Sequence, residues 1–561
     1  MIVSAGNESQ AAINNGLAAI AADPLINGQV VIAGAINNLD ALSDFSNFAG
    51  PELQDFFLSA PGEGVITISL NDILFSVSGT SFAAPHVSGA IALLWERFPN
   101  LSAQEIVEIL FTSADDLGTI GTDTFFGRGK LNIGAALSPL GTLSLPMGTT
   151  VAQPGFDVAS SAISLGSAFG DALAGQSLLS RGIVLDSFSR TFSFDLRDLI
   201  IRPGATPDLL LRARNSARRN AHYVRLSNRQ SLSIAFSDHE AFTDGEAFSS
   251  TRSYLDLRES LTPRYRDLSF SFTTSWGRHA AVTVSGGTGF SGGTIYGDRH
   301  DGGGDLLSPG ARPSPFAALV QQENSLALSY RFDNGTDIRL ATAVGKPLDH
   351  SDFGSDRRAV GNVLSIKRKS ESGASFGVEV GSVLERGGFL DSAARGAFDS
   401  VDGATTLFAT VSGTMPIARN WLLVGQFSQG LTRIHEAGFE LLSDFSSIRA
   451  SGFNVGAMTF DLFQKGDWLA VNLSQPLRVD RASATLEIAT GRDFLSDAIF
   501  RDTGTVDLAP SGREIDFELA YRIASRQDFS IQTNLLYQIN PGHAAGAPGA
   551  LSLFLEISKS F

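Results

Sequence analysis

The chain has 561 residues, a net charge of −16 and no cysteine. This length allows two large domains or three to four ordinary ones, and the absence of cysteine excludes disulfide scaffolds, cysteine-ligated metal sites and cysteine nucleophiles. The negative charge argues against a nucleic-acid partner, because binding to a polyanion needs a basic face. Residues 1–140 carry 14 acidic and 3 basic side chains, so most of the charge lies at the front. Two differently built parts are therefore expected.

Membrane and export signals are weak at the level of simple hydropathy. No stretch reaches about 18 consecutive apolar residues, so no transmembrane helix is predicted, although membrane β-strands give a much weaker signal. Met1 leads directly into Ile2-Val3-Ser4 without a basic segment, so no signal peptide is expected at this start.

Residues 1–140 have the pattern of an α/β domain. Short apolar runs at 29–34 and 64–68 alternate with turn clusters. One helix is predicted to begin near Thr80-Ser81 and to run through Leu94. A second should begin at Ser102, where Ser102 and Glu105 have the spacing of a capping box. We expect a parallel sheet covered by these helices.

Residues 141–230 are predicted to be a linker, and the basic segment 212–219 within it a solvated helix face. From about residue 231 to 561, apolar and polar residues alternate with a period of two. The best segments, near 515–521, 529–537 and 551–561, are each about 10 residues long, the span of a tilted membrane strand. A soluble β-sandwich would show the same alternation. A long Gly/Asp-rich insertion at 297–313 and a short turn at 524–528 favour an all-β transmembrane barrel of about 12 strands.

The sharpest chemical signal is the run 79–89, Gly-Thr-Ser-Phe-Ala-Ala-Pro-His-Val-Ser-Gly, which joins a loop to an apolar helix. A serine at a helix N-terminus lies where free backbone N–H groups and the positive end of the helix dipole meet. That field stabilises negative charge on an attacked carbonyl oxygen. An isolated Thr-Ser pair would more simply be a helix cap.

The run 79–89 resembles the nucleophile motif of the subtilases, the subtilisin-like serine peptidases. Further segments match the family in the right order: Ser4–Asn7, Phe45–Phe48, Ser59–Gly62, Phe126–Asn132 and Ala135–Leu137. The resemblance implies a partial subtilisin-like catalytic domain over residues 1–140, with Ser81 as the nucleophile. It implies that the Asn7 amide and the Ser81 backbone N–H bind the oxyanion, and that Ala5 and Gly6 line the floor of the substrate pocket. It implies a polypeptide substrate and neither a cofactor nor a catalytic metal.

The chain departs from the family at the general base. In subtilases the triad Asp and His both precede the oxyanion Asn, yet only six residues precede Asn7, and none is Asp or His. The one histidine in residues 1–140, His86, lies five positions after Ser81, about 140° around a helix. We therefore expect this chain to be an N-terminally truncated portion of a longer protein and to be inactive alone.

Residues 231–561 resemble the autotransporter β-domain. The matching features are Lys465–Asp467, Ser474–Arg478, Asn540–His543 and the terminal aromatic Phe561, and Val184–Arg190 resembles the linker that follows the peptidase in subtilase autotransporters. The resemblance implies an outer-membrane location, a passenger at the cell surface or secreted, and the barrel-assembly machinery as a partner. The Gly-rich group Asp298, His300, Asp301 and Asp305 is interpreted as a solvated loop and not as a metal site.

Two alternatives stay open. One is a non-enzymatic outer-membrane or surface protein whose peptidase passenger has decayed. The other is a soluble two-domain protease with a C-terminal β-sandwich.

Overall fold

The computed structural model describes residues 1–11, 20–21, 26, 28–68, 72–201, 220–239, 265–287, 314–316, 319–346, 357–436, 438, 441–524 and 529–559. The chain divides into two compact units, each described here by itself. The front unit comprises Met1–Ala159, Arg181–Asp195 and Ile488–Asp502, and the back unit comprises Ser160–Ser180, Leu196–Glu487 and Thr503–Phe561.

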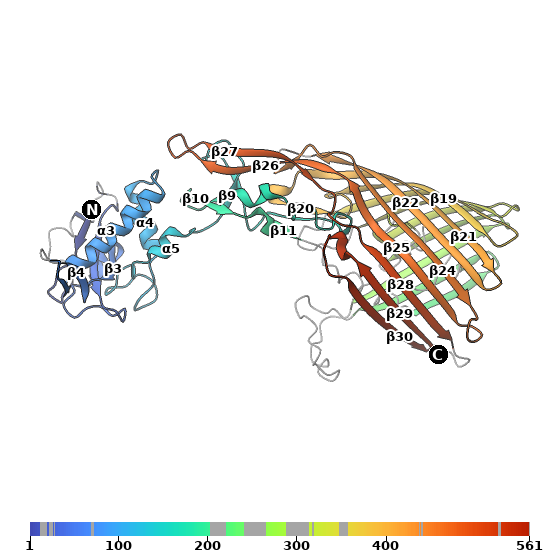
Figure 1. Cartoon of the computed structure of the whole chain (residues 1–561), viewed down its shortest axis with the longest axis horizontal. Helices are drawn as coiled ribbons and strands as arrows, with labels where there is room; N and C mark the ends of the chain where they lie inside the picture. The colour runs from blue at the N-terminus through green and yellow to red at the C-terminus, as the bar shows by residue number, and fades with distance from the viewer. Residues whose placement is uncertain are drawn as a thin grey trace. The chain divides into compact units, whose positions relative to one another are not determined.

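The front unit is built on a three-stranded parallel sheet, drawn in blue in Figure 1. Its strands are β1 (Ile2–Ser4), β2 (Val31–Ile36) and β3 (Phe57–Pro61), paired in that order. Both faces of β2 are buried, with Val31 and Ala33 in one apolar cluster and Ile32 in another. Burial on both faces is typical of parallel sheets and explains the continuous apolar run at 29–34.

Helices cover this sheet as the sequence predicts. Helix α3 (Thr80–Arg97) packs Ala83, Val87 and Leu94 into the same cluster as Val31. Helix α4 (Ala103–Thr112) begins after Ser102, whose side chain and that of Glu105 form the predicted capping box. The remaining elements of this part are α2 (Gly50–Leu53), η2 (Gln54–Phe56), β4 (Val65–Ile68), β5 (Leu74–Val77) and α5 (Ile133–Leu137).

The segment after α5 belongs partly to the front unit. A four-stranded sheet of order β10-β9-β6-β7 is formed by β6 (Ser144–Pro146), β7 (Gly155–Asp157), β9 (Gly182–Leu185) and β10 (Thr191–Phe194). In the turn between β9 and β10, Asp186 and Arg190 form an ion pair of 2.7 Å with both side chains fully buried. Arg190 lies 5.0 Å from the centre of the Phe98 ring and donates to the carbonyl oxygens of Ala136 and Ser138. This turn therefore joins the ends of α3 and α5.

The back unit is dominated by one antiparallel sheet, in which fifteen strands are described. Figure 1 shows its strands running at a common slant while the sheet curves, with the orange and red strands nearest the viewer. In order of pairing they are β12 (Asn220–Ser227), β13 (Gln230–His239), β14 (Tyr265–Trp276), β15 (Ala280–Gly287), β16 (Gln321–Arg331), β17 (Thr336–Lys346), β18 (Arg358–Lys369), β19 (Ser375–Arg386), β21 (Val401–Ala418), β22 (Trp421–Glu436), β24 (Ile448–Phe460), β25 (Trp468–Arg481), β28 (Ile515–Ala524), β29 (Phe529–Ile539) and β30 (Ala550–Lys559).

The two faces of this sheet have an unusual polarity. Large apolar side chains are exposed on the outer face, and Leu551, Leu553 and Leu555 of the last strand are each more than 60% exposed. Polar side chains are buried on the inner face, where Glu518 accepts from Asn534 at 2.7 Å and Thr406 contacts Thr432 at 2.8 Å. A soluble β-sandwich buries its apolar face, so this arrangement is the reverse of the sandwich considered above.

Shorter elements complete the back unit. A small sheet joins β8 (Ala162–Ser164) to β11 (Ile200–Ile201) and β20 (Ala393–Arg395), and another has the order β23-β26-β27. Its strands are β23 (Leu442–Ser443), β26 (Ser483–Arg492) and β27 (Ile499–Asp507). The 3-10 helices are η3 (Ser167–Phe169), η4 (Ser177–Arg181, at the border of the units), η5 (Leu196–Leu199), η10 (Gly396–Phe398) and η11 (Pro541–His543).

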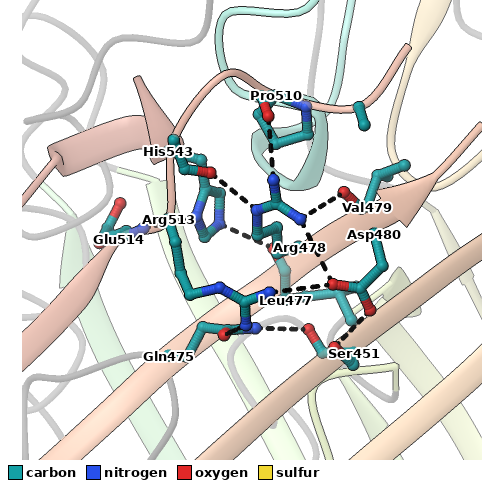
Figure 2. A network of polar contacts seen from close by, with 12 residues as sticks. Ser451, Gln475, Leu477, Arg478, Val479, Asp480, Pro510, Arg513, Glu514 and His543 are labelled. Atoms are coloured by element: carbon teal, nitrogen blue, oxygen red, sulfur yellow. Dashed lines mark hydrogen bonds and ion pairs between the residues drawn. The ribbon is translucent and has the colours of Figure 1, made fainter. Parts of the chain in front are cut away.

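A buried polar network holds the turns at one end of this sheet (Figure 2). Arg478 of β25 donates to the carbonyl oxygens of Gly512 at 2.7 Å and Pro510 at 2.9 Å. His543 of η11 accepts the Glu514 N–H at Nδ1 (2.9 Å) and donates its Nε2–H to the carbonyl oxygen of Leu477 at 3.1 Å. Nδ1 can accept while Nε2–H donates only if the ring is neutral. Burial is the main cause that lowers the pKa of His543 to about 4, and the neighbouring cations act in the same direction.

Several sequence predictions can be compared with this fold. The predicted strands near 515–521, 529–537 and 551–561 fall on β28, β29 and β30. The count of about 12 barrel strands is not confirmed, because fifteen strands share the described sheet and no β12–β30 pairing is found among the described residues. Strand β12 begins at Asn220, inside the predicted linker 141–230. The basic segment 212–219 and the His300 group lie outside the described residues.

None of the helices described here is long and apolar enough to cross a membrane.

Candidate active site

Ser81 lies at the N-terminus of the longest helix that the structure describes. Gly79 precedes α3 with a φ of +154°, a backbone conformation that other residues rarely adopt, and donates its N–H to the Gly62 carbonyl at 2.8 Å. Ser81 is the second residue of α3, and its side chain is exposed. Its backbone N–H is one of the first four of the helix, which have no acceptor within the helix. The serine hydroxyl and a free N–H therefore lie side by side at the positive end of the helix dipole.

The Asn7 side chain contacts the start of the same helix. Its Oδ1 accepts the backbone N–H of Thr80 at 2.9 Å and the Thr80 hydroxyl at 3.1 Å. Thr80 is fully buried, and its Oγ1 also accepts the Gly6 N–H at 3.2 Å. Since Oδ1 of Asn7 is held on the residue directly before Ser81, the amide has Nδ2 left as its donor. The structure thus holds Asn7 against Thr80, the residue before Ser81 and 73 positions from Asn7 in the sequence.

The loop that carries Asn7 is held by Asn47, a buried residue from a separate segment of the chain. Asn47 accepts the N–H groups of Glu8 at 3.0 Å and Gln10 at 3.1 Å through Oδ1, and donates Nδ2 to the Ala5 carbonyl at 3.0 Å. Gly6 has a φ of +104°, and a Cβ there would lie only 2.4 Å from Asn47 Nδ2. Only glycine fits at position 6. Asn47 thereby fixes the position of the backbone on both sides of Asn7.

We expect Asn47→Ala to destabilise the front unit by about 2 kcal/mol, because buried backbone N–H and C=O groups lose their partner. Urea-dependent pulse proteolysis of the front unit measures this effect. Asn37→Ala is the matched control, since Asn37 accepts two N–H groups in an exposed turn, and its loss should cost less than about 1 kcal/mol. Equal effects of the two substitutions would contradict the role given to Asn47.

The other predicted site residues lie as follows. Ala5 is 2% exposed and packs in the cluster that contains Val30 and Ile32, so its methyl group belongs to the core. His86 is exposed and donates Nδ1–H to the Phe82 carbonyl one turn back at 2.8 Å. Among the described contacts none joins His86 to Ser81, in agreement with the helical geometry.

Sequence reasoning did not single out Thr80 or Asn47. Thr80 lies inside the run 79–89, but the motif predicts a chemical role for its neighbour Ser81 and none for Thr80. Asn47 lies in the matched segment 45–48, which carries no titratable group. A buried amide with partners up to 42 positions away has no periodic signature, so its role becomes visible only in the folded chain.

Comparisons with known proteins agree on the front of the chain. A family model described as "Subtilase family" matches residues 1–129. The "Extracellular serine protease" of Serratia marcescens is 46% identical over 71 residues, covering 13% of this chain and 7% of that protein. The "Neisserial autotransporter lipoprotein NalP" of Neisseria meningitidis serogroup B is 38% identical over 96 residues, covering 17% and 9%.

The matches are local. "Subtilisin DY" of Bacillus licheniformis is 32% identical over 137 residues, which are 24% of this chain and 46% of that protein. Among solved structures, the "Prenylagaramide maturation protease PagA" is 29% identical over 24% of this chain and 48% of its own, with a TM-score of 0.21. The chain spans less than half the length of each of these relatives.

Proposed function

We propose that the chain carries the nucleophile part of a serine endopeptidase as the passenger of an outer-membrane autotransporter, because the subtilase family model matches residues 1–129. The contact of the Asn7 amide with Thr80, directly before Ser81, supports this proposal most strongly. It unites a nucleophile, a side-chain donor and a helix N-terminus at one point, the set that acyl transfer needs.

The residues present account for one half of the reaction. Ser81 Oγ attacks the carbonyl carbon of the scissile peptide bond, and the carbonyl oxygen becomes an oxyanion. Asn7 Nδ2 and the Ser81 backbone N–H donate to this oxyanion. The amine leaves with a proton, an acyl ester forms on Ser81, and water hydrolyses the ester. A general base must take the Ser81 hydroxyl proton and return it to the leaving amine.

The chain alone is proposed to be inactive, since among the described residues no general base is found in contact with Ser81. His86 is the one histidine in residues 1–140, and its Nδ1 is bonded to Phe82. Without a base the hydroxyl is a weak nucleophile.

The back unit supports the membrane part of the proposal. Its outward apolar side chains and its buried polar inner face match a sheet whose outside contacts hydrocarbon and whose inside is wet. We propose a closed barrel in the outer membrane, inserted by the barrel-assembly machinery, with the front unit at the cell surface or released from it. The substrate is a polypeptide.

A fluorophosphonate probe tests the peptidase proposal. The isolated 561-residue chain should not be labelled, because the probe reports an activated serine. Where the DNA upstream of Met1 encodes an Asp motif and a His motif in any frame, the protein extended by that sequence should be labelled. Ser81→Ala should abolish that labelling, and Asn7→Ala should slow it on the order of 10²-fold. Ser88→Ala, an exposed serine on the same helix, should leave it unchanged.

Two outcomes would contradict parts of this proposal. Labelling of Ser81 in the isolated chain would disprove the inactivity. Absence of labelling in the extended protein, or of any Asp and His motif upstream, would favour the non-enzymatic surface protein. The bonding of His86 to Phe82 is the observation that keeps this alternative open.

A further inference from the structure

A row of apolar residues runs across six strands on the inner face of the large sheet. Strand pairing aligns Ala327, Ala341, Val363, Gly381, Phe408 and Gly430 on six neighbouring strands, from β16 to β22. Five of the six are buried and Gly381 is half-buried. The inner-face neighbours of Phe408 and Gly430, namely Thr406, Thr410 and Ser428, are polar. At β21 and β22 the row is therefore apolar between polar side chains.

The residues before β16 cover this row. Ser314, Phe316, Leu319 and Val320 are all buried, with Phe316 at 0% exposure. The Phe316 ring stacks on Phe408 with centres 5.2 Å apart and planes 14° apart, and the Ser314 hydroxyl lies 3.5 Å from that of Thr410. These contacts place residues 314–316 over the inner face of β21.

Glycines make room for the covering side chains. A Cβ on Gly430 would lie 2.5 Å from the Phe316 ring, and a Cβ on Gly381 would lie 2.5 Å from the Phe408 ring. A Cβ on Gly361, the inner-face glycine of β18, would lie 3.2 Å from Val320. Since a side chain at Gly381 or Gly430 could not coexist with the rings, three glycines and Phe408 form a socket for the residues 314–316 and 319–320.

We propose that residues 314–316 and 319–320 form an internal constriction that narrows the interior of the barrel and restricts the passage of solutes. This inference rests on the proposed membrane barrel. An aromatic ring held on the wall of a polar interior displaces water and reduces the open cross-section of the interior at the height of the ring. The stacking and the socket hold it there, because the apolar side chains would otherwise face water.

Gly430→Ala tests the constriction directly. Its methyl group would displace the Phe316 ring, so the potassium chloride conductance of the full chain in planar bilayers should rise severalfold above that of the native protein. Gly425→Ala is the matched control on the same strand, since a Cβ there meets nothing within 4 Å, and its conductance should equal the native value. Equal conductance of native protein and Gly430→Ala would overturn the proposal. Phe316→Ala removes the ring itself and should give the same increase if Gly430→Ala does not fold.

A thiol probe separates this inference from the membrane proposal. The chain has no cysteine, so Thr410→Cys introduces a single thiol beneath Ser314. A charged methanethiosulfonate reagent should modify it severalfold faster in the Gly430→Ala background than with Gly430 intact. Equal rates of thiol modification in the two backgrounds, in a protein that does insert into vesicles, would contradict the constriction but not the membrane barrel. Failure of the native chain to associate with vesicles would instead sink the membrane barrel.

Discussion

Asp186→Ala is expected to destabilise the front unit by about 3–5 kcal/mol, the largest effect of any single change considered, because it leaves a buried guanidinium without its counter-charge. The Arg190 and Asp186 side chains are both fully buried and lie 2.7 Å apart. The carboxylate also accepts the backbone N–H groups of Leu140 and Phe188. It also accepts the backbone N–H of Arg190 at 2.9 Å, so its removal leaves one charge and three backbone donors without their partner.

Pulse proteolysis in urea, read on the front unit of the full chain, measures this loss. The control is Asp502→Ala, which breaks the ion pair with Arg181, also 2.7 Å long but with side chains 62% and 38% exposed. An exposed pair contributes less than about 1 kcal/mol. If the two substitutions shift the urea midpoint equally, the turn 186–190 does not hold the front unit together.

Acidification is expected to weaken the back unit through His543. The pKa of this ring is lowered from 6.5 to about 4 by burial. The hydrogen bond to the Leu477 carbonyl and the Asp480 carboxylate raise it, while Arg478 and Arg513 lower it further. Between these two pH values the ring binds a proton in the unfolded chain but not in the native chain. The free energy of unfolding therefore keeps its full value above pH 6.5 and decreases as the pH falls towards 4. The full difference corresponds to about 3 kcal/mol.

His543→Gln isolates this contribution from the carboxylates that titrate in the same range. Glutamine can accept the Glu514 N–H and donate to the Leu477 carbonyl but does not titrate. Heat-modifiable gel migration from pH 7 to pH 4 should show a smaller loss of folded protein for this variant than for the native chain. The exposed His279→Gln should behave like the native chain. Identical pH profiles for all three would show that His543 does not control acid stability.

Local signals in the front unit were sufficient to predict its main elements. The capping box at Ser102 and the apolar spacing up to Leu94 identified both helices, because helix caps and apolar helix faces depend on residues only a few positions apart. Their tertiary partners were not predictable in this way. Arg190 was part of a segment interpreted as linker, yet it is fully buried against Phe98, since its carboxylate and aromatic partners come together only on folding.

The back unit shows a different limit. The period of two identified strands such as 515–521, but a barrel and a sandwich share that period, so only the burial of Glu518 and the exposure of Leu519 reveal which face points outward. The covering segment was missed for another reason. Phe316 follows a Gly/Asp-rich insertion typical of a surface loop, and no periodicity marks a ring that folds back onto Phe408.

The central claim is that a membrane-embedded sheet presents a subtilase segment outside the cell. It is tested most directly by expressing the chain behind a bacterial export signal in a Gram-negative host and adding an external protease to intact cells. We predict that residues 231–561 fractionate with the outer membrane in a heat-modifiable form, while an antibody epitope placed in residues 1–140 is detected on, and removed from, intact cells. Recovery of the whole chain in a soluble fraction, with the epitope protected until lysis, would contradict the account.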